Sequence, residues 1–267
     1  MNLRLGRITG SVQPTHLMRV DSDLLRFAGR IELHQISVDL IHVFPLQVRK
    51  KFDEEMKEKV TLLLFTQEPS RLTVPDHLKG QECVFCKETR ELLKEVSALS
   101  DKIELVIYDF SGDKEKAAEY GIDKIPATII LGQKDYGLRF FGIPSGYEYT
   151  SLIEAILDVS KGKTGLSQKT REALKTIDKD IHIQVFVTPT CPYCPQVVHL
   201  GHQFALESPR IRADMVESTE FPHISHKYNV FGVPKTVINE NIFIDGAVPE
   251  ETFLEHVLKA LKSQSQK

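Results

Sequence analysis

The sequence of 267 residues has only four cysteines, and none of them lies outside two short motifs. Secreted disulfide scaffolds scatter paired cysteines through their loops, so this pattern argues against that class. There is no run of about 18 apolar residues that would predict a membrane span. The first thirty residues lack the compact apolar stretch of a secretory signal. The net charge of -3 leaves no basic surplus to hold a phosphate backbone. We therefore expect a cytoplasmic protein that binds neither membranes nor nucleic acid.

The cysteines belong to an internal repeat. Each Cys-x-x-Cys motif is followed by an apolar residue and a proline, and the proline lies 43 residues after the first cysteine in both cases. A shift of 108 residues superimposes the two sets: Cys83, Cys86, Ile125 and Pro126 in the first, and Cys191, Cys194, Val233 and Pro234 in the second. Such a period predicts two copies of one structural unit.

The hydrophobic periodicities of both copies predict the order β-α-β-α-β-β-α, preceded in each copy by a leading helix, at residues 46–59 and 167–177. We therefore predict an α/β fold of two tandem thioredoxin-like units, each a mixed central sheet flanked by helices. The predicted units span residues 46–163 and 164–267. Residues 1–45 form an N-terminal extension whose order the sequence does not indicate. Residues 67–82 are predicted to form a surface loop beside the first motif.

A cysteine pair at the start of a helix is suited to redox chemistry. The first sulfur faces the unpaired N–H groups and the positive end of the helix dipole, which stabilises its thiolate. We expect Cys191 to be the attacking nucleophile with Cys194 as the resolving cysteine, and Cys83 and Cys86 to have the same roles in the first unit. The apolar Val84-Phe85 pair predicts a less accessible first dithiol, and Glu82 would oppose thiolate formation at Cys83. We therefore rank the second site as the stronger nucleophile.

The two repeated prolines are candidates for substrate binding. Most X-Pro bonds are trans, but the equal spacing of Pro126 and Pro234 from the cysteines favours a cis turn beside each sulfur pair. Such a turn would expose the backbone of Ile125 and Val233 to an extended substrate segment. The alternative is that each proline only starts an edge strand.

Other interpretations of these residues remain. Zinc would need four thiolates around one ion, but the two pairs lie far apart in the sequence. Inert structural disulfides would be unusual at helix starts in a reducing compartment. One of the two pairs could also be degenerate. His199 and His202 lie too far along their helix to reach Cys191, so we interpret them as packing or solvated residues. We predict no metal and no bound organic cofactor.

Two segments carry a family resemblance: Val187-Thr-Pro-Thr-Cys-Pro-Tyr-Cys194 and Val230-Phe-Gly-Val-Pro-Lys235. They resemble the protein disulfide oxidoreductases of thermophiles, also called glutaredoxin-like proteins, and the resemblance extends over about residues 46–262. It implies two thioredoxin folds with a redox-active dithiol in each. It also implies reductase, oxidant and isomerase activity on protein disulfides, recycling by a thioredoxin-reductase-type flavoenzyme, and, as in some members, a homodimer. The glutathione-binding residues of glutaredoxins have no match here.

The sequence thus predicts a cytosolic protein disulfide oxidoreductase that exchanges dithiols and disulfides with protein substrates. One alternative is a dedicated electron donor to a peroxiredoxin, because the tandem-fold part of peroxiredoxin reductases is also similar. That part has one working dithiol, whereas this chain has two intact pairs. The other alternative is a non-catalytic protein that binds zinc or serves as a scaffold.

Overall fold

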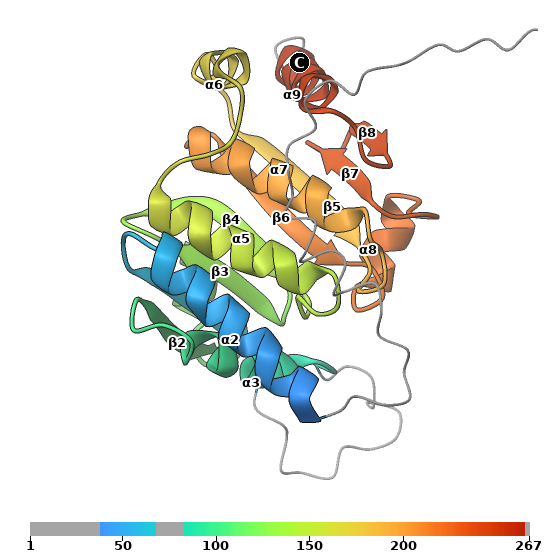
Figure 1. The fold of residues 1–267 in the computed structure, drawn as a ribbon. Helices are drawn as coiled ribbons and strands as arrows, with labels where there is room; N and C mark the ends of the chain where they lie inside the picture. Colours follow the sequence, from blue (N-terminus) through green and yellow to red (C-terminus); the bar gives the residue numbers. More distant parts are fainter. Residues whose placement is uncertain (1–37, 68–82, 265–267) are drawn as a thin grey trace, which may run out of the picture. The chain divides into compact units, whose positions relative to one another are not determined.

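A single mixed sheet of eight strands organises the described part of the chain in the computed structural model (Figure 1). The structure describes residues 38–67 and 83–264. Most of the predicted N-terminal extension and of the 67–82 loop, Glu82 included, therefore lies outside the described residues. Among the helices that are described, none is both long and apolar enough to cross a membrane.

The first copy of the repeat has the predicted order of elements, led by a helix. Its elements are α2 (Val38–Glu55), β1 (Val60–Thr66), α3 (Cys86–Ser97), β2 (Ile103–Asp109), α4 (Lys114–Glu119), β3 (Ala127–Leu131), β4 (Asp135–Phe141) and α5 (Glu148–Lys161). The leading helix begins at Val38 rather than at the predicted residue 46, with Pro45 inside it. A proline removes one helical hydrogen bond but does not prevent the flanking turns from forming.

The second copy has the same order. Its elements are α6 (Gln168–Leu174), β5 (Ile181–Val187), α7 (Cys194–Glu207), β6 (Ile211–Glu217), α8 (Pro222–Lys227), β7 (Lys235–Ile238), β8 (Ile242–Asp245) and α9 (Glu250–Gln264). In both copies the second cysteine of the motif is the first residue of a helix. The predicted fold class is confirmed.

The two copies share one sheet, with the strand order β2-β1-β3-β4-β6-β5-β7-β8. Strand β4 of the first copy pairs in parallel with β6 of the second, from Leu138 opposite Ala213 to Phe141 opposite Val216. The sequence predicted a sheet for each unit but not this junction. As a consequence β6 is a central strand and almost wholly buried, whereas its counterpart β2 is an edge strand with several exposed residues.

Helices cover both faces of the sheet, as predicted. One hydrophobic core joins α2, α3, α5, α7 and α9 to one face, and a second core joins α4, α8 and the loops that follow them to the other. Figure 1 shows α2, α5 and α7 side by side across the first of these faces. Helix α5 of the first copy therefore packs directly against α7, the helix that begins at the second cysteine of the second motif.

The contact between α5 and α7 brings residues of the first copy to the second redox motif. The Tyr147 N–H donates to the carbonyl oxygen of Pro189 at 2.9 Å, two residues before Cys191. Farther along, the carboxylate of Asp158 bonds the Nε2 of His199 at 2.8 Å. The buried His202 ring packs edge-on against Phe140, and its burial lowers its pKa to about 4. His199 therefore joins α7 to α5, whereas His202 packs α7 against β4.

Candidate redox centres

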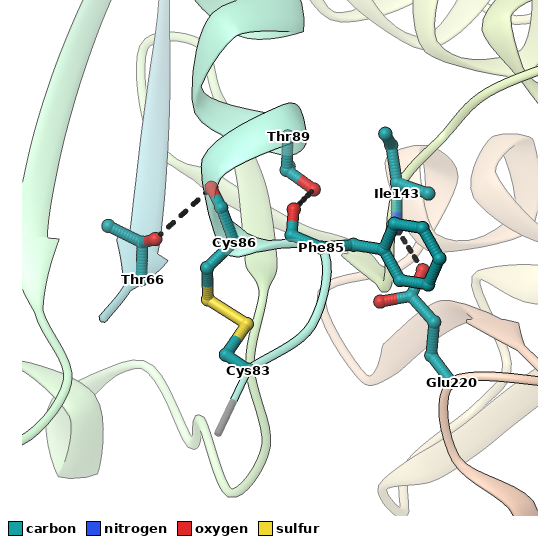
Figure 2. Close-up of a disulfide and its surroundings, with 7 residues drawn as sticks. All are labelled: Thr66, Cys83, Phe85, Cys86, Thr89, Ile143 and Glu220. Carbon is teal, nitrogen blue, oxygen red and sulfur yellow. Dashed lines mark hydrogen bonds between the residues drawn. A yellow bond between two sulfur atoms is a disulfide. The ribbon is translucent and has the colours of Figure 1, made fainter. Parts of the chain in front are cut away.

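The first centre is the disulfide between Cys83 and Cys86 (Figure 2), whose Cα atoms lie 5.4 Å apart. Cys86 opens α3 and is 2% exposed, whereas Cys83 is half-buried. The Cys86 carbonyl accepts a hydrogen bond of 3.4 Å from the Thr66 hydroxyl at the end of β1. The Phe85 carbonyl accepts from both the N–H and the hydroxyl of Thr89. These bonds fix the turn that carries the two sulfurs.

The second centre is the disulfide between Cys191 and Cys194, with a Cα separation of 5.5 Å. Cys194 opens α7 and is completely buried. The Cys191 N–H donates to the Thr188 carbonyl at 3.1 Å, which closes the turn from β5 into the motif. Cys191 is 7% exposed, so it is more buried than Cys83. The expectation that the first dithiol is the less accessible one is therefore wrong. Val84 is 71% exposed, and Phe85 extends away from the disulfide rather than over it (Figure 2).

No side chain caps the N–H groups at the starts of the two helices that follow the first cysteines. Phe85 and Tyr193 occupy the N-cap positions of α3 and α7, and neither provides a side-chain acceptor. A thiolate next to such a helix end is stabilised by the unpaired N–H groups and the dipole. The first turn of α3 also carries Glu88, whereas the first turn of α7 has no acidic residue. This difference favours thiolate formation at the second centre.

The proline turns lie where the repeat places them. The Ile125–Pro126 and Val233–Pro234 peptide bonds are both cis, as expected. The carbonyls of the two prolines accept matching hydrogen bonds, from Gly142 N–H at 2.9 Å and from Gly246 N–H at 2.8 Å. In the second copy, the Cys191 Sγ lies 3.7 Å from the Val233 carbonyl oxygen. The structure thus brings the second motif and its proline turn together.

A buried glutamate, not identified from the sequence, begins α5. Glu148 is 1% exposed and follows Tyr147, the residue bonded to Pro189 of the second motif. Its Oε2 accepts a hydrogen bond of 2.6 Å from Ser151, while its Oε1 has no partner among the described residues. Burial raises its pKa to about 8. The sequence did carry a signal, because Glu148 lies four residues before the buried Leu152 and so occupies the apolar face of the helix.

A second carboxyl group with a raised pKa lies at the junction of the two copies. Glu220 follows β6 and accepts a hydrogen bond of 2.6 Å from the Ile143 N–H of the first copy. Its partial burial, together with the neighbouring Glu217, raises its pKa to about 7. In Figure 2, Phe85 points from the first disulfide turn toward Ile143 and Glu220. This carboxyl group therefore links the second copy to the surroundings of the first centre.

The arrangement of acidic, histidine and cysteine side chains does not favour a metal site. Across the described parts of the chain, no group of three or more His, Cys, Asp or Glu side chains is placed to hold a metal ion. The four cysteines are paired within their own motifs.

Comparisons with known proteins agree with this geometry. A thioredoxin domain family matches residues 181–259, which is most of the second copy. The solved structure of a protein disulfide oxidoreductase from Aeropyrum pernix superimposes with a TM-score of 0.75 at 32% identity, covering 85% of this chain and 96% of that one. The N-terminal domain of the alkylhydroperoxide reductase AhpF from Enterococcus faecalis superimposes with a TM-score of 0.71 at 27% identity, covering 80% of this chain and 97% of that domain.

Curated relatives include the AhpF component of the alkyl hydroperoxide reductase of Staphylococcus aureus, 28% identical over 169 residues. That match covers 63% of this chain but only 31% of the relative, so the chain spans about a third of the length of the curated proteins it matches. The fold and the two cysteine centres define a thioredoxin-like disulfide oxidoreductase with two Cys-x-x-Cys sites. At the identity and coverage of the Aeropyrum structure, the chain belongs to the protein disulfide oxidoreductase family.

Proposed function

We propose that this protein exchanges dithiols and disulfides with protein substrates through both of its Cys-x-x-Cys centres. The observation that carries the proposal is that each copy of the repeat holds a cysteine pair at an uncapped helix start, with the second sulfur buried and the first one more exposed. A thiolate at the first position can attack an external disulfide, and the buried second thiol can then resolve the intermediate. We place this activity in a reducing compartment such as the cytoplasm.

In the reducing direction, the Cys191 thiolate attacks one sulfur of the substrate disulfide and displaces the other as a thiolate. The Cys194 thiol then loses its proton and attacks Cys191 in the mixed disulfide. This attack forms the Cys191–Cys194 disulfide and releases the second substrate sulfur as a thiolate. Two electrons have passed from the protein to the substrate, and both released thiolates take up protons. Cys83 and Cys86 perform the same steps in the first copy.

Substrate segments bind beside the proline turns. The Val233 carbonyl lies next to Cys191, so an extended polypeptide that pairs with the Val233 backbone would bring its own sulfur to the nucleophile. Val233 and Pro234 form this surface at the second centre, and Ile125 and Pro126 form the equivalent surface at the first.

Glu148 is the candidate proton acceptor for the second centre. Resolution requires a base in a buried place, because Cys194 itself has no exposed surface. Glu148 is buried and follows Tyr147, whose N–H bonds to Pro189 two residues before Cys191, and its raised pKa lets its ionised form take up a proton near neutral pH. The group comes from α5 of the first copy, so the second centre would be complete only when both predicted units, 46–163 and 164–267, are present.

The partners are protein disulfides and dithiols, with a thioredoxin-reductase-type flavoenzyme restoring the reduced form. A second candidate function is electron donation to a peroxiredoxin, which the similarity to the AhpF N-terminal domain favours. Assays that compare an insulin-like disulfide with an oxidised peroxiredoxin separate the two functions. Preference for the insulin-like disulfide supports the general oxidoreductase, and exclusive turnover of peroxiredoxin supports the alternative.

Separate Cys83→Ser and Cys191→Ser variants test the proposal. Both should lose insulin-disulfide reduction in part, and Cys191→Ser should lose more, because the first turn of α7 lacks the acidic residue found in α3. Equal losses would contradict the ranking of the two sites. Full activity in the double variant, or stoichiometric zinc in a protein without thiol turnover, would refute the enzymatic proposal and favour the zinc-binding alternative.

A further inference from the structure

The two proline turns are preceded by loops with the same backbone and different side chains. In the second copy, Asn229 has a positive φ of 52°, and the Val230 N–H then bonds back to the Ser225 carbonyl at 2.9 Å. In the first copy, Gly121 has a φ of 64°, and the Ile122 N–H bonds back to the Ala117 carbonyl at 2.8 Å. We call these the 229–233 loop and the 121–125 loop.

The residues at the tips of these loops differ in polarity. The 121–125 loop presents Asp123 and Lys124, which form an ion pair of 2.5 Å, and Lys124 also lies over the Phe141 ring at 3.8 Å. The equivalent positions of the 229–233 loop are Phe231 and Gly232. Phe231 is 95% exposed, although the preceding Val230 packs into the core beneath it.

Single apolar side chains are often exposed, but Phe231 lies on a loop that ends beside the reactive sulfur, where a substrate must bind. A partner that covered this ring would gain the free energy of burying a large apolar side chain. The loop is held at one end by the turn at Asn229, whose carbonyl accepts a hydrogen bond of 3.1 Å from Lys235, and at the other by Val233 beside Cys191. A rigid aromatic group of this kind loses little entropy when a partner covers it.

The charged side chain that bonds to the 229–233 loop, Lys235, is only 12% exposed and is already paired with Asp245 at 3.4 Å. Thr190, Pro192 and Tyr193 from the second motif are exposed, and Tyr193 is 66% exposed. A substrate segment with a charged residue next to its half-cystine would lose hydration against these groups without gaining an ion pair. A segment with an apolar residue at that place would bury Phe231 without such a cost.

We infer that Phe231 is a specificity-determining residue of the second centre, which selects protein disulfides whose half-cystine is flanked by an apolar side chain. The inference rests on the proposed exchange function and deepens it. It also implies that the two centres differ in substrate selectivity. The 121–125 loop has the ion pair of Asp123 and Lys124 at the equivalent positions, so the first centre should not prefer an apolar flanking residue.

Single-turnover reduction of two peptides tests this inference. Each peptide is closed by a disulfide and differs only in having Leu or Glu beside one half-cystine. The protein carries Cys83→Ser and Cys86→Ser, so that only the second centre reacts, and it is first reduced with dithiothreitol that is then removed. Its dithiol becomes a disulfide as the peptide disulfide becomes two thiols. At sub-saturating peptide concentration, Phe231→Ala should lower the rate of reduction of the Leu peptide about tenfold and that of the Glu peptide less than about twofold.

Three controls accompany the test. Phe231→Leu should retain most of the rate that Phe231→Ala loses. A small aromatic disulfide should react equally with all variants. Phe243→Ala, which removes a 45% exposed phenylalanine of β8, should leave the ratio of the Leu-peptide rate to the Glu-peptide rate unchanged. An unchanged ratio in Phe231→Ala would overturn the inference. So would a change confined to sedimentation behaviour, which would assign Phe231 to contact between two copies of the chain. If neither peptide is reduced before Phe231 is changed, the proposed function fails instead.

Discussion

Substitution of Glu148 by glutamine tests the carboxyl group that we place beside the second centre. The pKa of Glu148 is raised from 4.5 to about 8 because the group is buried, and only the Ser151 hydroxyl opposes the shift. The folded protein therefore holds this proton more tightly than the unfolded chain does. The stabilisation is fully present below pH 4.5 and is lost as the pH rises toward 8.

The size of the effect follows from the shift. At 1.36 kcal/mol for each pKa unit, the shift corresponds to roughly 5 kcal/mol of stability, of which roughly 4 kcal/mol is lost between pH 5 and pH 9. Water that enters around the ionised group lowers this value, so we expect a loss of about 3 kcal/mol from this residue. Glu148→Gln cannot ionise. It should match the parent protein at pH 5 within about 1 kcal/mol and exceed its stability at pH 9.

Equilibrium urea unfolding of the oxidised proteins at pH 5, 7 and 9 measures this difference. Glu115→Gln is the matched control, because Glu115 lies in the first turn of α4 but is exposed. The same variant also tests the chemistry in a single-turnover exchange assay. If Glu148 takes the proton from Cys194, then Glu148→Gln should slow release of the mixed disulfide while leaving its formation unchanged. A stability difference from the parent that is the same at pH 5 and pH 9 would refute the reasoning.

Two further substitutions test the packing that supports the site. Gly146→Ala should destabilise the protein by about 3 kcal/mol or more in urea unfolding, because the φ of Gly146 is 60° and a Cβ atom there would collide with the Pro189 carbonyl oxygen. Gly162 has the same φ but open space around it, so Gly162→Ala should cost only about 1 kcal/mol. Equal costs would show that the Pro189 contact is unimportant. Burial opposes ionisation of Asp214, but the hydrogen bond from His182 and the ion pair with Arg212 outweigh it and hold the Asp214 pKa well below its usual range. Asp214→Asn should therefore cost about 3 kcal/mol at pH 7 and progressively less below pH 4, since the carboxylate contributes stability above its unfolded pKa and loses it as the pH falls. A cost that does not change between pH 7 and pH 3 would contradict this assignment.

Much of the fold could be predicted because its signals are local. Apolar periodicity sets the helices and strands, and the repetition of that pattern after 108 residues identifies two copies of one unit. The cysteine pairs at helix starts and the cis prolines were predicted correctly for the same reason, since they depend on residues that are close in sequence or at a repeated spacing.

Accessibility at the two centres could not be predicted in this way. Val84 and Phe85 suggested a covered first dithiol. In the structure Val84 is exposed and Phe85 extends away from the disulfide, so Cys83 is half-buried, whereas Cys191 is only 7% exposed. The cover over a sulfur atom is provided by residues distant in sequence, such as the Val233 turn beside Cys191. The two residues between the cysteines therefore do not predict how accessible the first sulfur is.

The sequence by itself determined the repeat, the element order, the redox chemistry of the cysteines and the membership of a disulfide oxidoreductase family. Only the tertiary structure decided how the copies join. The strands β2 and β6 occupy equivalent places in the repeat, yet β6 pairs with β4 and is buried with Asp214 and Glu217 inside it, whereas β2 stays at the edge. The same junction joins Tyr147, the residue before Glu148 in one copy, to Pro189, two residues before Cys191 in the other. Periodicity shows which face of a strand or helix is apolar, but which surface covers that face depends on contacts between residues far apart along the chain.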